Sequence, residues 1–324
     1  MAKSIIWFLT PVIVLCIALL AGWGILGALN RADQAVLKAQ ANAMTATTSP
    51  ASQPADAGPI GPYPWLSHSD PANTIASRIP VPHGYERVQV DPDRLAIWLR
   101  NLPLKPDGAP VLLFNGKPAA NQSAHVAVVD IDVGNKDIQQ CADAIIRLKA
   151  EYLYSHRRYG DIHFNFASGA NVGFSDWAKG LKPVVDGPRV TWPRPRRNTR
   201  EDYSHENLRA YLETVMTYAN TASLAGELAP VGSPKNMQIG NIFVQPAQGE
   251  RYGHAVIVVD MAQGPNGRKA FLLAQGFMPA QSIHVLKNPR PADAGIAPWY
   301  DVNFGPRLAT PEWTFDRKDL KHFK

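Results

Sequence analysis

Two short runs, Gly240-Asn-Ile-Phe-Val244 and Gly253-His-Ala-Val-Ile-Val-Val-Asp260, decide the predicted fold of this chain. Each run is rich in Val, Ile or Phe and is bounded by polar residues and glycine, which is typical of a strand. The second run begins with His254. A histidine at the entry of a strand can face a cleft while the residues after it are buried, so His254 is a candidate for chemistry if it has a partner.

The candidate partner is Cys141, the only cysteine after the N-terminal apolar run. It lies at the head of an expected helix that ends near Ser155, and Asp137 with Gln140 has the spacing of a capping box. Backbone N–H groups at a helix start and a nearby imidazole both favour the thiolate, the nucleophilic form of cysteine. Cys141 also lies on the apolar stripe of this helix, which is equally typical of a small buried residue.

A third residue should accept a hydrogen bond from the other imidazole nitrogen, and Gln275 is the candidate. If the hairpin is centred near residues 264–265, Gln275 lies opposite His254. A tight turn at residues 266–267 places it opposite Val258 instead, and Gln281 is then the alternative. Asp260 is excluded, because six residues of strand separate it from His254 by about 20 Å.

Two further residues have roles that the sequence leaves open. Gln140 is a candidate oxyanion donor, and its alternative role is that of a capping side chain. The run Ala124-His125-Val-Ala-Val-Val-Asp130 resembles the one that begins at Gly253, so His125 is a second candidate base.

The N-terminal segment predicts a membrane anchor. Residues 5–29 form a nearly unbroken apolar run, long enough to cross a bilayer core, which takes about 20 residues. We therefore expect an anchor over residues 1–31, a flexible Ala/Ser/Pro-rich linker over 32–62 and a single globular domain over 63–324. This organisation predicts a single-pass protein of the inner membrane with its domain outside the cytoplasm.

Charge and motifs narrow the chemistry. The net charge of +6 suits a protein that works near an anionic envelope polymer, whereas aromatic and basic residues do not interleave as on a nucleic-acid-binding surface. No serine-hydrolase elbow, zinc-binding or phosphate-loop motif occurs. Asp130, Asp132 and Asp137 superficially resemble a calcium loop, but the glycine is misplaced and Cys141 stands where the closing glutamate is needed. We expect neither a metal nor a cofactor.

The order of expected elements predicts an α+β fold. Strands are expected over 124–133, 161–166 and 270–275, and a second helix over 204–228. The segments Gln139-Gln140-Cys141-Ala-Asp-Ala, Asn165-Phe166, Gly253–Asp260 and Leu273-Ala-Gln275 through Lys287-Asn-Pro289 resemble an uncharacterised bacterial domain-of-unknown-function family. More distantly, a cysteine at a helix head followed by Gly-His-Ala-Val-Ile is similar to NlpC-type and CHAP-type papain-like hydrolases.

The distant resemblance implies a papain-like α+β domain, with a central helix packed on an antiparallel sheet, behind the N-terminal transmembrane helix. It also implies a cysteine peptidase or amidase that acts on cell-wall peptide. Cys141 would be the nucleophile, His254 the general base and Gln275 the residue that orients the base. The alternative is a non-catalytic envelope protein that keeps the fold and binds peptidoglycan, another wall polymer or a membrane partner.

Overall fold

The computed structural model describes residues 61–91, 94–195, 200–290 and 295–324. All of these residues belong to one compact unit. The predicted anchor and nearly all of the predicted linker lie outside the described residues.

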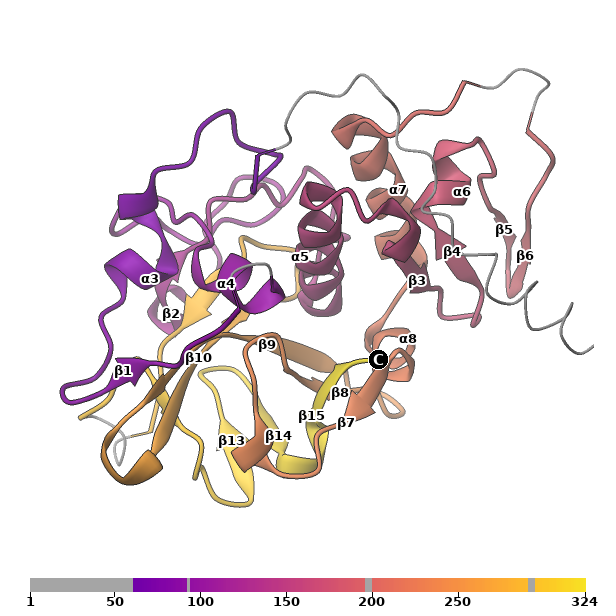
Figure 1. Cartoon of the computed structure of the whole chain (residues 1–324). Coiled ribbons are helices and arrows are strands. Elements are labelled where there is room, and N and C mark those ends of the chain that lie inside the picture. Colours follow the sequence, from indigo (N-terminus) through magenta and orange to yellow (C-terminus); the bar gives the residue numbers. More distant parts are fainter. Residues whose placement is uncertain (1–60, 92–93, 196–199, 291–294) are drawn as a thin grey trace, which may run out of the picture. The chain divides into compact units, whose positions relative to one another are not determined.

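A large antiparallel sheet forms the base of the described domain (Figure 1). Its strands follow the order β2-β11-β10-β9-β8-β15-β7, with β1 also paired to β9 and β12 to β10. The strands are β1 (Glu86–Arg87), β2 (His125–Val128), β7 (Leu228–Pro230), β8 (Ile242–Gln245), β9 (His254–Gln263), β10 (Lys269–Gln275), β11 (His284–Leu286), β12 (Tyr300–Asp301) and β15 (Leu320–Phe323).

Three two-stranded sheets accompany it. They are β3 (His163–Asn165) with β4 (Asn171–Gly173), β5 (Val184–Asp186) with β6 (Arg189–Thr191), and β13 (Arg307–Ala309) with β14 (Thr314–Asp316). In Figure 1 the hairpin of β13 and β14 lies on the side of the large sheet away from α5. Its Phe315 packs against Phe243 of β8, with ring centroids 5.8 Å apart.

Helices cover the other side of the sheet, and α5 packs against β9 and β10. The helices of the described chain are α3 (Ile75–Arg78), α4 (Leu95–Arg100), α5 (Cys141–Ser155), α6 (Phe174–Ala178), α7 (His205–Tyr218) and α8 (Thr221–Gly226). The helix expected over 204–228 is thus two helices. Asn220 divides them, because its side chain accepts hydrogen bonds from the N–H groups of Ala222 and Ser223 and starts a new helix.

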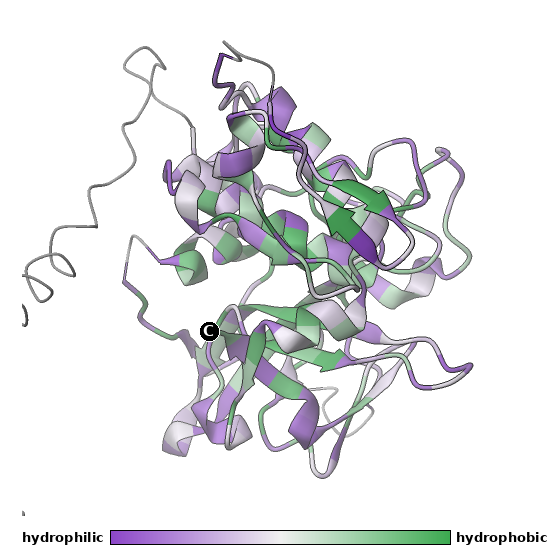
Figure 2. Ribbon diagram, turned by 90° about the vertical axis from the view of Figure 1, so that its right-hand side faces the viewer, coloured by the Kyte–Doolittle hydropathy of each residue, from purple (hydrophilic) through white to green (hydrophobic). Residues whose placement is uncertain are grey.

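The hydrophobic core includes most of strand β9. Nine of the ten residues of β9 are buried, and only Gln263 at its end is exposed. A strand covered on both faces reads as a continuous apolar run rather than an alternating one, which explains the sequence from Ala255 to Val259. Figure 2 shows the same hydrophobic character along the strands beneath the helices.

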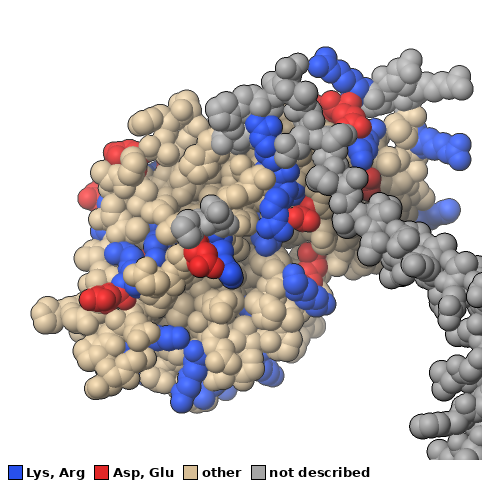
Figure 3. Space-filling model, in the orientation of Figure 1, with Lys and Arg blue, Asp and Glu red and all other residues tan. Residues whose placement is uncertain are grey.

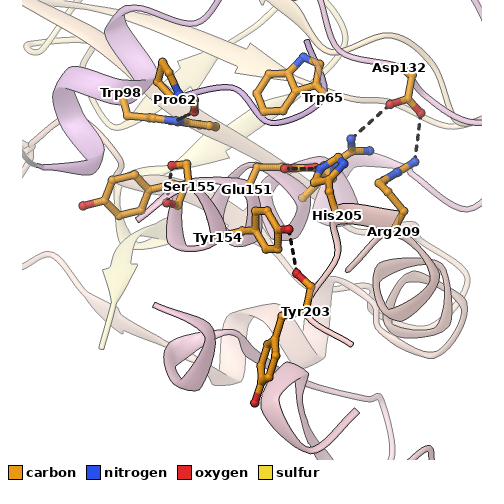
Figure 4. Close-up of polar contacts among 12 residues, drawn as sticks. Pro62, Trp65, Trp98, Asp132, Glu151, Tyr154, Ser155, Tyr203, His205 and Arg209 are labelled. Atoms are coloured by element: carbon orange, nitrogen blue, oxygen red, sulfur yellow. Dashed lines mark hydrogen bonds and ion pairs between the residues drawn. The ribbon is translucent and has the colours of Figure 1, made fainter. Parts of the chain in front are cut away.

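Helix α5 also carries two charged side chains with no exposed surface, Arg147 and Glu151. Arg147 donates to Glu151 at 2.6 Å and to Asp132 at 3.2 Å. His205 and Arg209 of α7 point at the same two carboxylates, at 2.9 and 3.0 Å (Figure 4). Buried charges are tolerated when each has a partner, so this network lets a polar stripe of α5 face α7 inside the protein.

The predicted papain-like fold is wrong. The domain is a mixed α/β structure whose sheet extends by β11 and β2 beyond β10 and by β15 and β7 beyond β8. The prediction relied on two short motifs, which specify one helix and one strand entry but carry no information on strands contributed by distant residues. The predicted transmembrane helix lies outside the described residues. Among the residues that the structure describes, no helix is long and apolar enough to cross a membrane.

Candidate functional site

The start of α5 lies beside the entry of β9. The Cys141 thiol is 3.9 Å from the carbonyl oxygen of Gly253, the residue before His254. The residue after β10, Gly276, closes on the same place, since a Cβ there would be 2.9 Å from the carbonyl oxygen of Gln140. The fold therefore brings the Cys141 thiol to the backbone just before His254, but the two side chains do not meet. The His254 ring packs against Trp313 and Phe315, on the face of the sheet away from α5. Cys141 itself is 4% exposed.

A β-bulge determines the face on which Gln275 lies. The register of β9 and β10 shifts by one residue between Leu272 and Leu273, which leaves Val259 of β9 without a partner. Alternate residues of a strand point to opposite faces, so a shift of one residue moves every later side chain of β10 to the other face relative to β9. The bulge thereby puts Gln275 on the face of His254, diagonally across the strand pair and within reach of a long side chain.

The His254 ring and the Gln275 amide are hydrogen-bonded, with 2.8 Å between Nε2 and Oε1. The orientation of the amide follows from its other end: Gln275 Nε2 lies 2.7 Å from a carboxylate oxygen of Glu312, which can only accept. Gln275 Oε1 must then accept from the Nε2–H of His254. This tautomer leaves Nδ1 of His254 unprotonated, and that buried nitrogen has no hydrogen-bond partner.

A second histidine completes the polar chain. His284 Nδ1 lies 2.8 Å from the carbonyl oxygen of Ser282, so it carries the proton. Its Nε2 is then free to accept from Gln275 Nε2, 3.2 Å away. Gln275 is thus held by Glu312 and His284 at one end and holds His254 at the other.

Aromatic side chains cover the imidazole of His254. The ring centroids of Phe277, Trp313 and Phe315 lie 5.0, 5.2 and 5.8 Å from it. Phe277 and Trp313 are only half-buried, so they separate His254 from solvent. Trp313 also borders a surface cavity of about 310 Å³ that is lined in addition by Tyr252 and Arg251.

Burial keeps the groups of this site uncharged. It raises the pKa of the Cys141 thiol to about 12, with the nearby Asp143 carboxyl adding to the rise. It lowers the pKa of His254 to about 4, against the opposing effect of its hydrogen bond to Gln275. Burial also raises the pKa of Asp143 to about 8. The helix start therefore does not favour a thiolate in this conformation, because desolvation outweighs the backbone N–H groups.

A family model described as Domain of unknown function (4846) matches residues 75–322. The chain belongs to the DUF4846 family. The expected membership of a domain-of-unknown-function family is thereby confirmed, and this family model is not an NlpC or CHAP model. No curated protein and no solved structure matches the chain.

The other predicted residues of this DUF4846 chain make no side-chain hydrogen bond to Cys141 or His254, as far as the chain is described. The Gln140 side chain donates to Asp137 at 3.1 Å. Gln281 is buried, with no hydrogen bond to His254 in the described part of the chain. His125 lies on β2, three strands from β9, or about 14 Å at the usual strand spacing. Its Nε2 faces the carbonyl oxygen of Ala109 at 3.3 Å.

Sequence reasoning missed three members of the site: His284, Glu312 and Asp143. His284 lies within the segment from Leu273 to Pro289 that carries the family resemblance, but no pattern there marks it as a partner of Gln275, and Glu312 lies beyond that segment. Asp143 lies only two residues after Cys141, but its burial results from tertiary packing and cannot be inferred from the local sequence. Among the described residues of this DUF4846 domain, no group of three or more His, Cys, Asp or Glu side chains could hold a metal ion.

Proposed function

We propose that the protein is a cysteine-dependent hydrolase of peptide or amide bonds, with Cys141 as nucleophile, His254 as general base and Gln275 as the residue that orients the base. The observation that supports this most directly is the tautomer of His254. Its Nε2–H is committed to Gln275, so its buried Nδ1 is a free basic nitrogen. The carbonyl group that contacts the Cys141 thiol belongs to the preceding residue, Gly253.

The reaction would proceed by acyl transfer. Because the Cys141 thiol and the His254 ring lie on opposite faces of the sheet in this conformation, the entry of β9 must first rearrange to bring them into contact. His254 Nδ1 then takes the thiol proton as Cys141 Sγ attacks the carbonyl carbon of the substrate. The C–N bond then breaks, and the imidazolium returns the proton to the leaving amine. A water molecule, deprotonated by the same nitrogen, hydrolyses the thioester and releases the acid and the free thiol. Gln275, held by Glu312, keeps the ring oriented through both steps.

The electrostatics imply that this conformation is a resting state. A proton transfer from a thiol of pKa about 12 to an imidazole of pKa about 4 costs roughly 11 kcal/mol. Admission of substrate and water past Trp313 would reduce the desolvation that lowers the pKa of His254. The thiol, on the α5 side of the sheet, must be hydrated by the rearrangement that brings it to His254. The cavity beside Trp313 is the natural entrance, since Tyr252 at its edge is 74% exposed and precedes Gly253 directly in sequence.

Cell-wall peptide is the proposed substrate class and the cell envelope the proposed location. The support comes from the sequence: the apolar run of residues 5–29, the net charge of +6 and the resemblance to wall hydrolases. A second candidate function is a non-catalytic envelope protein. The burial of Cys141 favours this non-catalytic function, because a buried thiol is inaccessible to a substrate.

The test uses the Cys16→Ser variant of the full-length chain, in which Cys141 is the single thiol. Incubation with purified peptidoglycan should release peptide fragments detectable by mass spectrometry. A further Cys141→Ala substitution should reduce the release by at least roughly 1,000-fold, because a covalent step is lost. The Asp186→Asn change in the exposed β5–β6 turn is the matched control and should leave activity unchanged. Equal release by the Cys141→Ala variant would refute the proposal.

The rate of iodoacetamide labelling separates the two candidate functions. A hydrolase whose site opens should be labelled on Cys141 in the native state, and peptidoglycan should protect it. A purely structural thiol should be labelled only at the rate of global unfolding, which urea titration measures independently.

A further inference from the structure

A groove of three adjoining cavities lies along α5, away from the cysteine site. The cavities have volumes of about 660, 450 and 390 Å³. Lys149 lines all three; the first and second also share Leu95, and the second and third share Phe323. Lys149 lies eight residues after Cys141, or about 12 Å along the helix axis.

Lys149 is a half-buried cation without an anionic partner. Its ammonium nitrogen lies between two aromatic rings, 5.9 Å from the centroid of Tyr152 and 4.9 Å from that of Phe323. Across the described ranges it forms neither a hydrogen bond nor an ion pair. Two charged groups, Arg158 and Asp161, act on it electrostatically with opposite signs, and they are bonded to each other at 2.6 Å. Burial lowers the pKa of Lys149, which is the cost of holding this charge away from water.

Basic side chains also gather around it. The face drawn in Figure 3 shows Lys and Arg grouped over α5, with fewer carboxylates beside them. Arg94, Arg158 and Lys269 line the first cavity together with a single acid, Asp91. An anionic group in this groove would meet a positive potential and would supply the partner that Lys149 lacks.

The third cavity is lined with groups that match hydroxyls. Asn171 donates to Asn165 at 2.8 Å and lies 3.3 Å from His163. Glu227 accepts from the backbone N–H of Asn165. Amide and imidazole groups can donate and accept hydrogen bonds and a carboxylate accepts them, which together suits sugar hydroxyls.

We propose that this groove binds an acidic carbohydrate, with the carboxylate or phosphate of the sugar at the Lys149 ammonium and its hydroxyls against the Asn165 and Asn171 side chains. The site is separate from the cysteine site and does not depend on hydrolysis. An oxyanion at the Lys149 ammonium completes its charge balance, and the adjoining cavities give an extended chain room on both sides.

The test is calorimetric titration of the full-length protein with three probes: an oligomer of glucuronic acid, an uncharged glucose oligomer of the same length, and inorganic phosphate. The uronic acid oligomer should bind at least tenfold more tightly than the glucose oligomer. Lys149→Met, which keeps an unbranched side chain of similar reach, should weaken its binding at least tenfold. Lys179→Met, an exposed lysine that lines none of the three cavities, is the matched control and should bind as wild type.

Three results would overturn the proposal: no binding of the uronic acid oligomer at millimolar concentration, equal binding of the two oligomers, or full binding by the Lys149→Met variant. Phosphate binding as tightly as the oligomer would show a free-anion site and would equally overturn the carbohydrate assignment. If Lys149→Met does not fold, the selectivity of the wild-type protein between the charged and uncharged oligomers still decides the question.

Discussion

Asp143 makes the protein less stable at neutral pH than it would be with a neutral side chain in the same place. One carboxyl oxygen accepts from the backbone N–H of Gln140 at 3.2 Å, and the other is buried without a partner. Burial raises its pKa from 3.8 to about 8, so at pH 7 the folded protein keeps the proton and the unfolded chain releases it.

The direction and size of this effect of Asp143 on the free energy of unfolding follow from proton linkage. The folded state binds the proton more tightly, so the free energy of unfolding falls as pH rises above 3.8 and stops falling near pH 8. At pH 7 the loss amounts to at most about 4 kcal/mol, and at pH 4 it is almost zero. Asp143→Asn keeps the acceptor for Gln140 and has no charge to bury. It should therefore stabilise the protein by up to about 4 kcal/mol at pH 7 and by less than about 1 kcal/mol at pH 4.

Urea denaturation of the full-length chain, followed by tryptophan fluorescence at pH 4, 5.5 and 7, measures this difference; the sequence has eight tryptophans. The Asp186→Asn change in the exposed β5–β6 turn is the control and should alter the free energy by under about 0.5 kcal/mol at each pH. A gain that does not vary with pH, or a loss at pH 7, would refute the reasoning. The latter result would mean that Asp143 is ionised in the folded state.

Three further predictions concern the packing and charge of the same region. Gly276→Ala should destabilise the protein by about 1–3 kcal/mol, because its Cβ would meet the start of α5 at 2.9 Å, whereas Gly160→Ala, with open space around it, should have little effect. Arg147→Met should destabilise the protein by about 3–5 kcal/mol, because it leaves the buried Glu151 with His205 as its remaining partner. Arg158→Met removes an exposed ion pair and should cost under about 1 kcal/mol. Equal costs for the two changes would contradict the network described for Arg147. In the Asp143→Asn background, the free energy of unfolding should fall as pH drops from 6.5 to 4, by roughly 3 kcal/mol for each of the buried His254 and His284. Both are neutral in the folded protein because burial lowers their pKa to about 4, whereas the unfolded chain takes up the proton at higher pH. A flat profile over that range would show that the two histidines are not neutral in the folded protein. Denaturation curves test all three.

The sequence predicted those elements best whose apolar pattern and end signals lie within a few residues of each other. Helix α5 ends at Ser155, as its apolar spacing indicated, but it begins at Cys141 with Gln140 and Asp143 as its capping box, one turn later than the predicted box of Asp137 and Gln140. Strand β9 runs from His254, as its apolar run indicated, although it continues to Gln263. These elements depend on residues within a few positions of one another, so a single sequence carries the information.

The predictions that were wrong concern features that depend on residues distant in the sequence. The sequence left two hairpin registers open for Gln275, and the structure has a third, because the bulge at Val259 leaves no mark in the local pattern. The strand expected over 124–133 is only His125–Val128, since its pairing partner comes from residues 284–286. The expectation that a helix start favours a thiolate at Cys141 failed for the same reason: its burial is set by β9 and by Gly276, which are far away in the chain.

The order of strands in the sheet has a consequence for biosynthesis. β2 pairs only with β11, whose residues follow it by more than 150 positions, and β7 pairs with β15 across some 90 positions. At the usual synthesis rate of roughly 5–20 residues per second, roughly 150 residues take about 8 to 30 s to emerge. Throughout that time the nascent chain presents an unsatisfied strand edge to the ribosome surface. We expect this protein to engage holding chaperones during translation, and synonymous changes that slow elongation between residues 130 and 280 should increase its aggregation.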